Sequence, residues 1–190
     1  MAAGDGLVSM TPTSVVAAGT SSSATINTDG GVDYTNCHTL SLSGVFTSDF
    51  DNYLIVMTMD PVGADNAAVI YHRMRAAGSD NSTGSSYTWQ RIYVTGTSVS
   101  GARTTGDIHQ TFYIEGAANG MQHHVYGPAL AQPTAFRTVV VSDVSSAAMY
   151  EHAGTHNQST SYDGLTYFMN NPGTDGGRAS GTVHVFGYEE

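Results

Sequence analysis

Apolar and polar residues alternate with a period of two along much of the chain from Asn36 onward. This period is typical of half-buried β-strands, because successive side chains of a strand point to opposite faces of its sheet. Segment 52–59 (NYLIVMTM) is nearly all apolar and predicts a central strand. Segment 87–94 (YTWQRIYV) predicts a strand with one shared face made of Tyr87, Trp89, Arg91 and Tyr93.

The same alternation predicts nine or ten strands in all. Further candidates are segments 38–42, 68–75, 107–115, 123–126, 136–141, 149–152, 165–169 and 181–188. Turn-rich stretches separate them, such as 78–86, 100–106 and 170–177. No segment of helical length shows a period of 3.6 residues, so we expect an all-β fold, a single antiparallel β-sandwich of jelly-roll type.

The first 33 residues carry little that indicates a core. Short apolar pairs stand at Leu7-Val8 and Val15-Val16, and the stretch between 19 and 24 is small and polar. We expect residues 1–33 to form an extended N-terminal arm or a loosely attached first strand, and residues 34–190 to form the sandwich. A frayed terminus is the alternative interpretation.

Charge excludes some partners. The 190 residues include 16 acidic and 6 basic ones, giving a net charge of −10, and all six basic residues are arginines. Nucleic acids and anionic membranes are bound by clustered cations, so neither is an expected partner. The start of the chain does not resemble a signal peptide, and no stretch has the length of a membrane-spanning helix, so we expect a soluble protein.

Metal and catalytic chemistry are not predicted. His123 and His124 should leave a strand on opposite faces, and Glu151-His152 with His156 does not form a zinc motif. Cys37 is the only cysteine, which excludes an intrachain disulfide. The chain has no G-x-S-x-G nucleophile motif, and Asp49 and Asp51 read as turn residues. We therefore expect no metal, no cofactor and no enzymatic activity.

Aromatic residues offer the best candidate for binding. The most promising candidate is the strand face made of Tyr87, Trp89, Arg91 and Tyr93. Tyr and Trp rings that stack on a ligand, beside an Arg that donates hydrogen bonds, suit a glycan or a protein partner. Further tyrosines that could contribute are at positions 71, 113 and 126. The alternative is a packed sandwich face whose tyrosine hydroxyls lie at the rim.

Three segments carry a resemblance to a known family: 45–56 (VFTSDFDNYLIV), 127–137 (GPALAQPTAFR) and 180–188 (SGTVHVFGY). They resemble small jelly-roll virion proteins of tailed bacteriophages, especially marine and cyanobacterial ones. Members of that family begin with Gly-Leu-Val, here residues 6–8, and place an F-x-x-x-F/Y-D-N-Y element before a buried strand, here Phe46 to Tyr53. They end on a G-x-[IV]-x-[VIL]-[YF]-G-Y strand, here Gly181 to Tyr188.

The resemblance implies a non-enzymatic structural protein on the virion surface, made in the host cytoplasm and forming a homo-oligomer, with a trimer as the favoured state. A capsid decoration or cement protein is the favoured role, with Leu7, Val8, Val15 and Val16 as the arm that anchors to the major capsid protein. The alternative is a tail-fibre or tailspike protein that binds a host-surface glycan. A free carbohydrate-binding lectin is the third interpretation.

Overall fold

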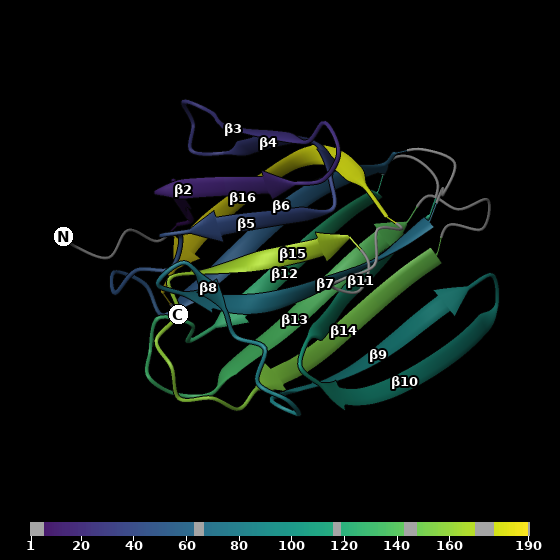
Figure 1. Ribbon diagram of the computed structural model, residues 1–190. Coiled ribbons are helices and arrows are strands. Elements are labelled where there is room, and N and C mark those ends of the chain that lie inside the picture. The colour runs from purple at the N-terminus through teal and green to yellow at the C-terminus, as the bar shows by residue number, and fades with distance from the viewer. Residues whose placement is uncertain (1–5, 63–66, 116–118, 143–147, 170–176, 190) are drawn as a thin grey trace.

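The computed structural model describes residues 6–62, 67–115, 119–142, 148–169 and 177–189. These residues form sixteen strands in two antiparallel sheets that pack face to face (Figure 1). The prediction of an all-β sandwich is therefore confirmed. Its finer assignment to the jelly-roll type is not confirmed by the observed strand order.

The large sheet has ten strands. Nine of them lie in the order β10, β9, β14, β13, β12, β6, β16, β4 and β3, and β1 pairs with β16 beside this path. Their bounds are β1 (Val8–Met10), β3 (Ser23–Ile26), β4 (Val32–Cys37), β6 (Asn52–Pro61), β9 (Tyr87–Thr95), β10 (Ser98–Gly106), β12 (Asn119–Tyr126), β13 (Thr134–Ser142), β14 (Ala148–His156) and β16 (Ala179–Tyr188).

The small sheet has six strands. Its order is β11, β7, β15, β5 and β2, and the short β8 pairs with β7. Their bounds are β2 (Ser14–Ala18), β5 (Thr39–Ser43), β7 (Ala67–Ala76), β8 (Ser79–Asp80), β11 (His109–Glu115) and β15 (Gly164–Met169).

The core lies between the two sheets and follows the alternation of the sequence. In β6, Tyr53, Ile55, Met57 and Met59 are buried while the residues between them are half-buried or exposed. In β15 every residue is buried, although it belongs to a sheet with a solvent side. The predicted central strand at 52–59 is thus β6, which lies between β12 and β16.

The N-terminal segment is built into the sandwich. β1 pairs with β16 in the large sheet, β2 pairs with β5 in the small sheet, and β3 pairs with β4 in the large sheet. Val15 packs against the core, whereas Leu7, Val8 and Val16 are 46–56% exposed. Residues 8–26 therefore contribute strands to both sheets, and the expected extended N-terminal arm is not confirmed.

Two of the sequence elements that carry the resemblance meet in space. A side chain at Gly187 in β16 would collide with the ring of Phe50, so only glycine allows this ring to lie on the strand. Tyr53 packs against both neighbouring phenylalanines, Phe46 and Phe50, with ring centroids 4.8 and 6.5 Å away. Its hydroxyl donates to the carbonyl of Thr47 at 2.7 Å, which fixes the loop before β6.

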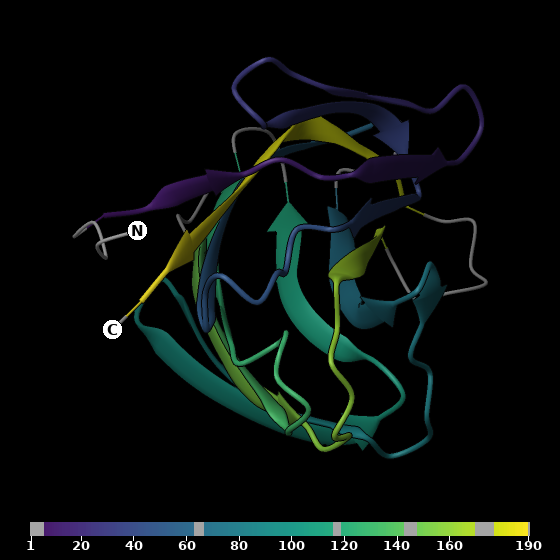
Figure 2. The ribbon, with the colours of Figure 1, turned by 90° about the vertical axis from the view of Figure 1, so that its left-hand side faces the viewer.

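The large sheet extends beyond the small one. It curls around the β11 edge, and the hairpin of β9 and β10 stands outside the double layer (Figures 1 and 2). Every residue of β10 except Gly106 is exposed, so both faces of this strand meet solvent. The inner face of β9 comes next to the edge strand β11, and we call this place the inner corner.

Candidate functional site

The predicted face of β9 points toward the interior of the sandwich. Tyr87 and Trp89 are 0% and 7% exposed, while Arg91 and Tyr93 are half-buried. The shared face is as the alternation predicted, but its first two residues are core residues. The four side chains therefore do not form one platform open to solvent, and only Arg91 and Tyr93 reach the corner.

A stack of side chains holds Arg91 in place. The Tyr93 ring stacks on the Tyr150 ring with centroids 5.6 Å apart and planes 19° apart. The guanidinium carbon of Arg91 lies 5.5 Å from the centroid of the Tyr93 ring, which is cation–π distance. Tyr113 of β11 completes the group, with its ring 6.0 Å from Tyr150.

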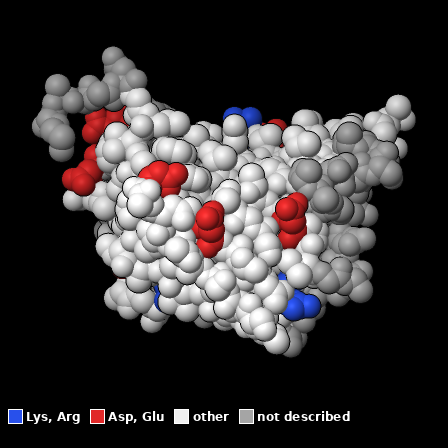
Figure 3. Space-filling model, turned by 90° about the horizontal axis from the view of Figure 1, so that it is seen from above, with Lys and Arg blue, Asp and Glu red and all other residues white. Residues whose placement is uncertain are grey.

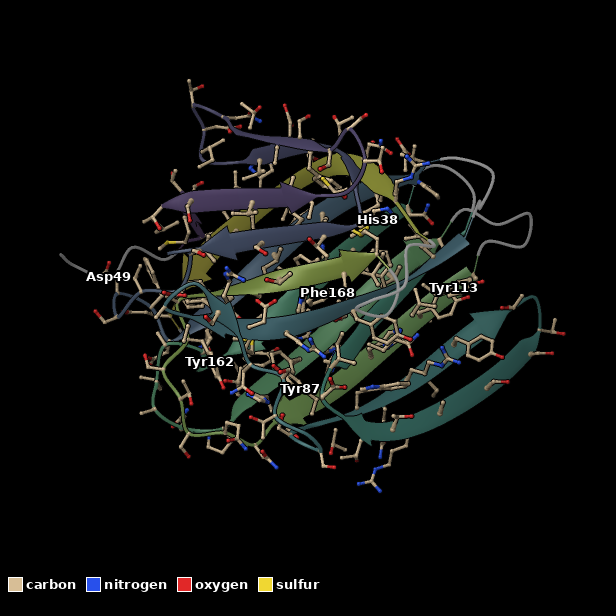
Figure 4. All side chains as sticks on the ribbon, viewed as in Figure 1. His38, Asp49, Tyr87, Tyr113, Tyr162 and Phe168 are labelled. Carbon is tan, nitrogen blue, oxygen red and sulfur yellow. The ribbon has the colours of Figure 1, made fainter. Side chains whose placement is uncertain are left out.

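The small sheet supplies the other wall of the corner. Figure 4 shows Tyr113 at the β11 edge of the small sheet, where the large sheet runs on past it. Burial raises the pKa of the Tyr71 hydroxyl, and the positive charge of Arg91 opposes that rise, which places the guanidinium near Tyr71. We call the group Tyr71, Arg91, Tyr93, Tyr113 and Tyr150 the Arg91 site.

Sequence reasoning found only part of this site. Tyr71 and Tyr113 belonged to the wider set of aromatic candidates, whereas Tyr150 was not singled out. Their strands are joined by pairings that connect distant parts of the chain, such as Tyr150 opposite Tyr93 between β14 and β9. The third additional tyrosine, Tyr126, stacks instead on His124, with centroids 6.0 Å apart.

A second unusual feature is a group of five histidines with no solvent exposure, which we call the histidine cluster: His72, His109, His123, His152 and His156. His72 and His109 are directly paired residues of β7 and β11. The His72 ring also lies 4.8 Å from the His123 ring, which belongs to the opposite sheet. The cluster therefore bridges the two layers.

Several of these imidazoles lack hydrogen-bond partners. His72 Nδ1 lies 2.8 Å from Thr111 Oγ1, and His123 Nδ1 lies 2.9 Å from the Tyr167 hydroxyl. The other ring nitrogen of each has no partner. Neither nitrogen of His109 or His152 makes a well-aligned hydrogen bond, although the backbone of Gln110 lies close enough to both rings to favour their protonated form slightly. Unpaired polar atoms at this depth cost free energy, so the cluster is an exception to the usual pairing of buried groups.

Burial keeps the cluster neutral. Desolvation, together with the charges of neighbouring histidines, holds the pKa values of His72 and His109 well below the usual range. Desolvation lowers the pKa to about 3 for His123 and His152 and to about 4 for His156. Near neutral pH these rings are uncharged.

The histidines are not arranged as a metal centre. Among the described residues, no three His, Cys, Asp or Glu side chains come together in a way that could hold an ion. His72 and His109 stack ring on ring instead of directing their nitrogens at one point. His123 and His124 do lie on opposite faces, as predicted: His123 is buried, and the Nδ1 of the half-buried His124 is 3.1 Å from the Tyr188 hydroxyl.

A shallow pocket of about 450 Å³ lies elsewhere, between the turn after β8 and the segment before β15. It is lined by Ala76, Ser79, Asp80, Asn81, Ser82, Thr83, Thr160 and Tyr162. Two of its polar groups already have partners: Asp80 accepts from Arg75 and Thr166, which lie outside the lining, and Asn81 donates to Tyr162. This arrangement favours a structural role for the pocket residues.

No protein-family model matches the chain, and no curated protein matches it. Among the described residues, the structure contains no helix that is both long and apolar enough to span a membrane. The function therefore has to be argued from the residues and their arrangement.

Proposed function

We propose that this protein is a non-enzymatic surface protein of a bacteriophage particle that binds a glycan of the host surface through the Arg91 site. The observation that carries the proposal is the half-buried arginine at cation–π distance from Tyr93, beside the exposed strand β10. Aromatic rings beside an arginine suit sugars, because rings pack on the apolar faces of a pyranose while the guanidinium donates to its oxygens.

The surface charge is consistent with a non-nucleic-acid partner. Charged residues make up only 12% of the chain, and the view from above shows isolated acidic and basic side chains separated by uncharged surface (Figure 3). Binding of a glycan depends on hydrogen bonds and ring stacking more than on a large surface area of positive or negative electrostatic potential.

Capsid decoration is the second candidate. Leu7, Val8 and Val16 are exposed apolar residues at the edge formed by β1 and β2, and a capsid subunit could cover them. Because this edge is part of the sandwich, such a contact would use a fixed surface and not a free arm. The two roles place the protein at different parts of the particle.

Labelling of intact virions with a gold-tagged antibody to this protein separates these roles. The proposal predicts gold at the tail, where receptors are bound. Gold over the heads would replace it with the decoration role. Particles without gold, from a preparation whose genome encodes the chain, would refute the virion proposal and leave a free lectin.

The proposal includes self-association, and a row of apolar residues on the outer face of the large sheet supports it. Val141 lies opposite Met149, Met149 opposite Val94, and Val94 opposite Val99. Val141, Met149 and Val99 are 61%, 46% and 65% exposed. Contiguous exposed apolar residues are typical of contact surfaces. Since the row carries no charge, a second acidic copy meets no like charge along it.

Sedimentation velocity tests the role of this row. Val99→Glu combined with Val141→Glu should convert an oligomer to monomers, because both charges would be buried in the contact. Gln90→Glu adds the same charge at an exposed position outside the row and should leave the oligomer intact. A wild-type chain that sediments as a monomer at high micromolar concentration would refute self-association.

A further inference from the structure

Three of the six arginines, Arg91, Arg103 and Arg178, make no ion pair with a described residue, and among these Arg91 alone has a buried nitrogen without a hydrogen-bond partner. Arg73, Arg75 and Arg137 form ion pairs with Asp107, Asp80 and Glu151. Arg91 makes no ion pair with any described residue, and its buried Nε has no hydrogen-bond partner. A half-buried cation without an anion is uncommon in a chain whose net charge is −10.

The guanidinium is held ready for a ligand. Its carbon lies over the Tyr93 ring, 5.5 Å from the centroid, and the buried Tyr150 stacks on the same tyrosine. Stacking uses the face of a guanidinium and leaves its N–H edges free to donate in the plane. Because burial and the contact with Tyr93 restrict the side chain, a ligand that binds it loses less side-chain entropy than one that binds a fully exposed arginine.

The strand beside Arg91, β10, carries small exposed residues. Ala102 is the residue directly opposite Arg91 on β10, and it is small and exposed. Its neighbours on the same face of β10, Ser100 and Thr104, are exposed too. The groups near Arg91 include His152, which is neutral, and the half-buried Tyr71 and Tyr93. Arg73, on the same face of β7 as Tyr71, is already paired with Asp107. Arg91 therefore supplies a positive charge that no described carboxylate offsets.

We infer that the Arg91 site selects sugars that carry a carboxylate, such as sialic or uronic acids. This inference rests on the proposed glycan-binding function and names its ligand class. A carboxylate accepts two parallel N–H bonds from a guanidinium, which a hydroxyl cannot do. The planar carboxylate would supply the missing counter-charge of Arg91, while the tyrosines around it pack against the sugar ring.

Binding of matched oligosaccharides tests the inference, with isothermal titration calorimetry as the readout. The pairs are 3′-sialyllactose with lactose, and trigalacturonic acid with galactotriose. A hydrogen bond to a charged group stabilises by roughly 1.5–3 kcal/mol, so the acidic member of at least one pair should bind about 10- to 100-fold more tightly. Lactose 3′-sulfate, an anion of different shape, should bind more weakly than 3′-sialyllactose.

Three variants test whether Arg91 is the residue that causes the preference for the acidic sugar. Arg91→Gln should remove the preference for the acidic sugar, and Arg91→Lys should restore only part of it, because lysine keeps the charge but not the paired donors. Arg103→Gln is the matched control, since Arg103 is an exposed arginine opposite Gln90 on the neighbouring strand. It should bind as the wild type does.

The affinities of the wild-type protein for the different sugars test the preference for a carboxylate even if a variant misfolds. Equal affinity for acidic and neutral members of both pairs would overturn the carboxylate inference while leaving glycan binding in place. Equal affinity for the sulfate would overturn it too. Absence of binding to every sugar would overturn both the inference and the glycan-binding function, whereas virion labelling tests the location on the particle independently.

Discussion

The imidazole rings of His72 and His109 stack on one another in the interior of the sandwich, with centroids 4.7 Å apart and planes 28° apart. Both rings are completely buried. Two charged imidazoles could not share this position, because they would repel each other without water to screen them. The native state therefore requires neutral histidines.

Acid should destabilise the protein below about pH 6.5, the ordinary pKa of an unfolded histidine. Between that value and the folded pKa values, about 4 for His156 and about 3 for His123 and His152, the unfolded chain binds more protons than the folded one. The free energy of unfolding is thus highest above pH 6.5 and decreases as the pH falls. Each histidine contributes on the order of 1.4 kcal/mol per pH unit.

Urea unfolding at several values between pH 7.5 and 5.5 measures this slope. His109→Leu should reduce it by about one histidine's share. A free energy of unfolding that is constant over this range would contradict a neutral buried cluster.

Two histidines of the cluster should respond differently to replacement by leucine at pH 7.5. His109 makes no well-aligned hydrogen bond at either nitrogen and only a weak contact with the backbone of Gln110, so His109→Leu removes two poorly satisfied atoms and should be neutral or stabilising. His123→Leu leaves the buried Tyr167 hydroxyl without its partner and should cost about 1–3 kcal/mol. Equal losses in chemical denaturation would show that packing, not hydrogen bonding, decides the outcome.

Adjacent residues of β2 test whether the N-terminal segment contributes to the stability of the sandwich. Val15 packs against the core, and Val16 is 56% exposed on the opposite face. Val15→Asp should lower the free energy of unfolding by roughly 2–4 kcal/mol, since it places a carboxylate against apolar side chains. Val16→Asp should change it by less than about 0.5 kcal/mol. Similar melting temperatures for both variants would instead indicate a detached arm.

Trp89 should behave as a core residue. It is 7% exposed, and its ring lies 6.4 Å from that of buried His152. Trp89→Ala should destabilise by about 3–5 kcal/mol, as deletions of large buried aromatic side chains do. Gln90→Ala, one residue along and exposed, serves as the control. Thermal unfolding that leaves the two variants equal would place Trp89 at the surface.

Strands in which apolar and polar residues alternate could be predicted from the sequence, whereas strands without this alternation were missed. The expected strands at 52–59 and 87–94 are β6 and β9, with the side chains divided between faces as the alternation indicates. Residues 100–106 read as a turn but lie in β10, because a strand exposed on both faces has no apolar period. The N-terminal strands β1 to β3 were read as an arm for a similar reason: short edge strands bury too few residues to form a pattern.

The site was harder to predict than the fold. Alternation groups Tyr87, Trp89, Arg91 and Tyr93 correctly, yet it does not say which face of the strand is inside. His72, His109, His123 and His152 each look like ordinary strand residues in the sequence. They come together because β7 pairs with β11 and because the two sheets pack face to face. These contacts join positions up to 80 residues apart in the chain. Local sequence patterns carry no information about such distant contacts.

The position of β16 affects how the molecule can be made. This strand lies in the interior of the large sheet, between β6 and β4, and it also pairs with β1. It leaves the ribosome after the other fifteen strands. Until then β4 and β6 each present an unpaired edge, the kind of surface on which incomplete chains associate with one another. Translation must therefore pass residue 188 before the large sheet can close, and prematurely terminated chains should be recovered as aggregates and not as folded fragments.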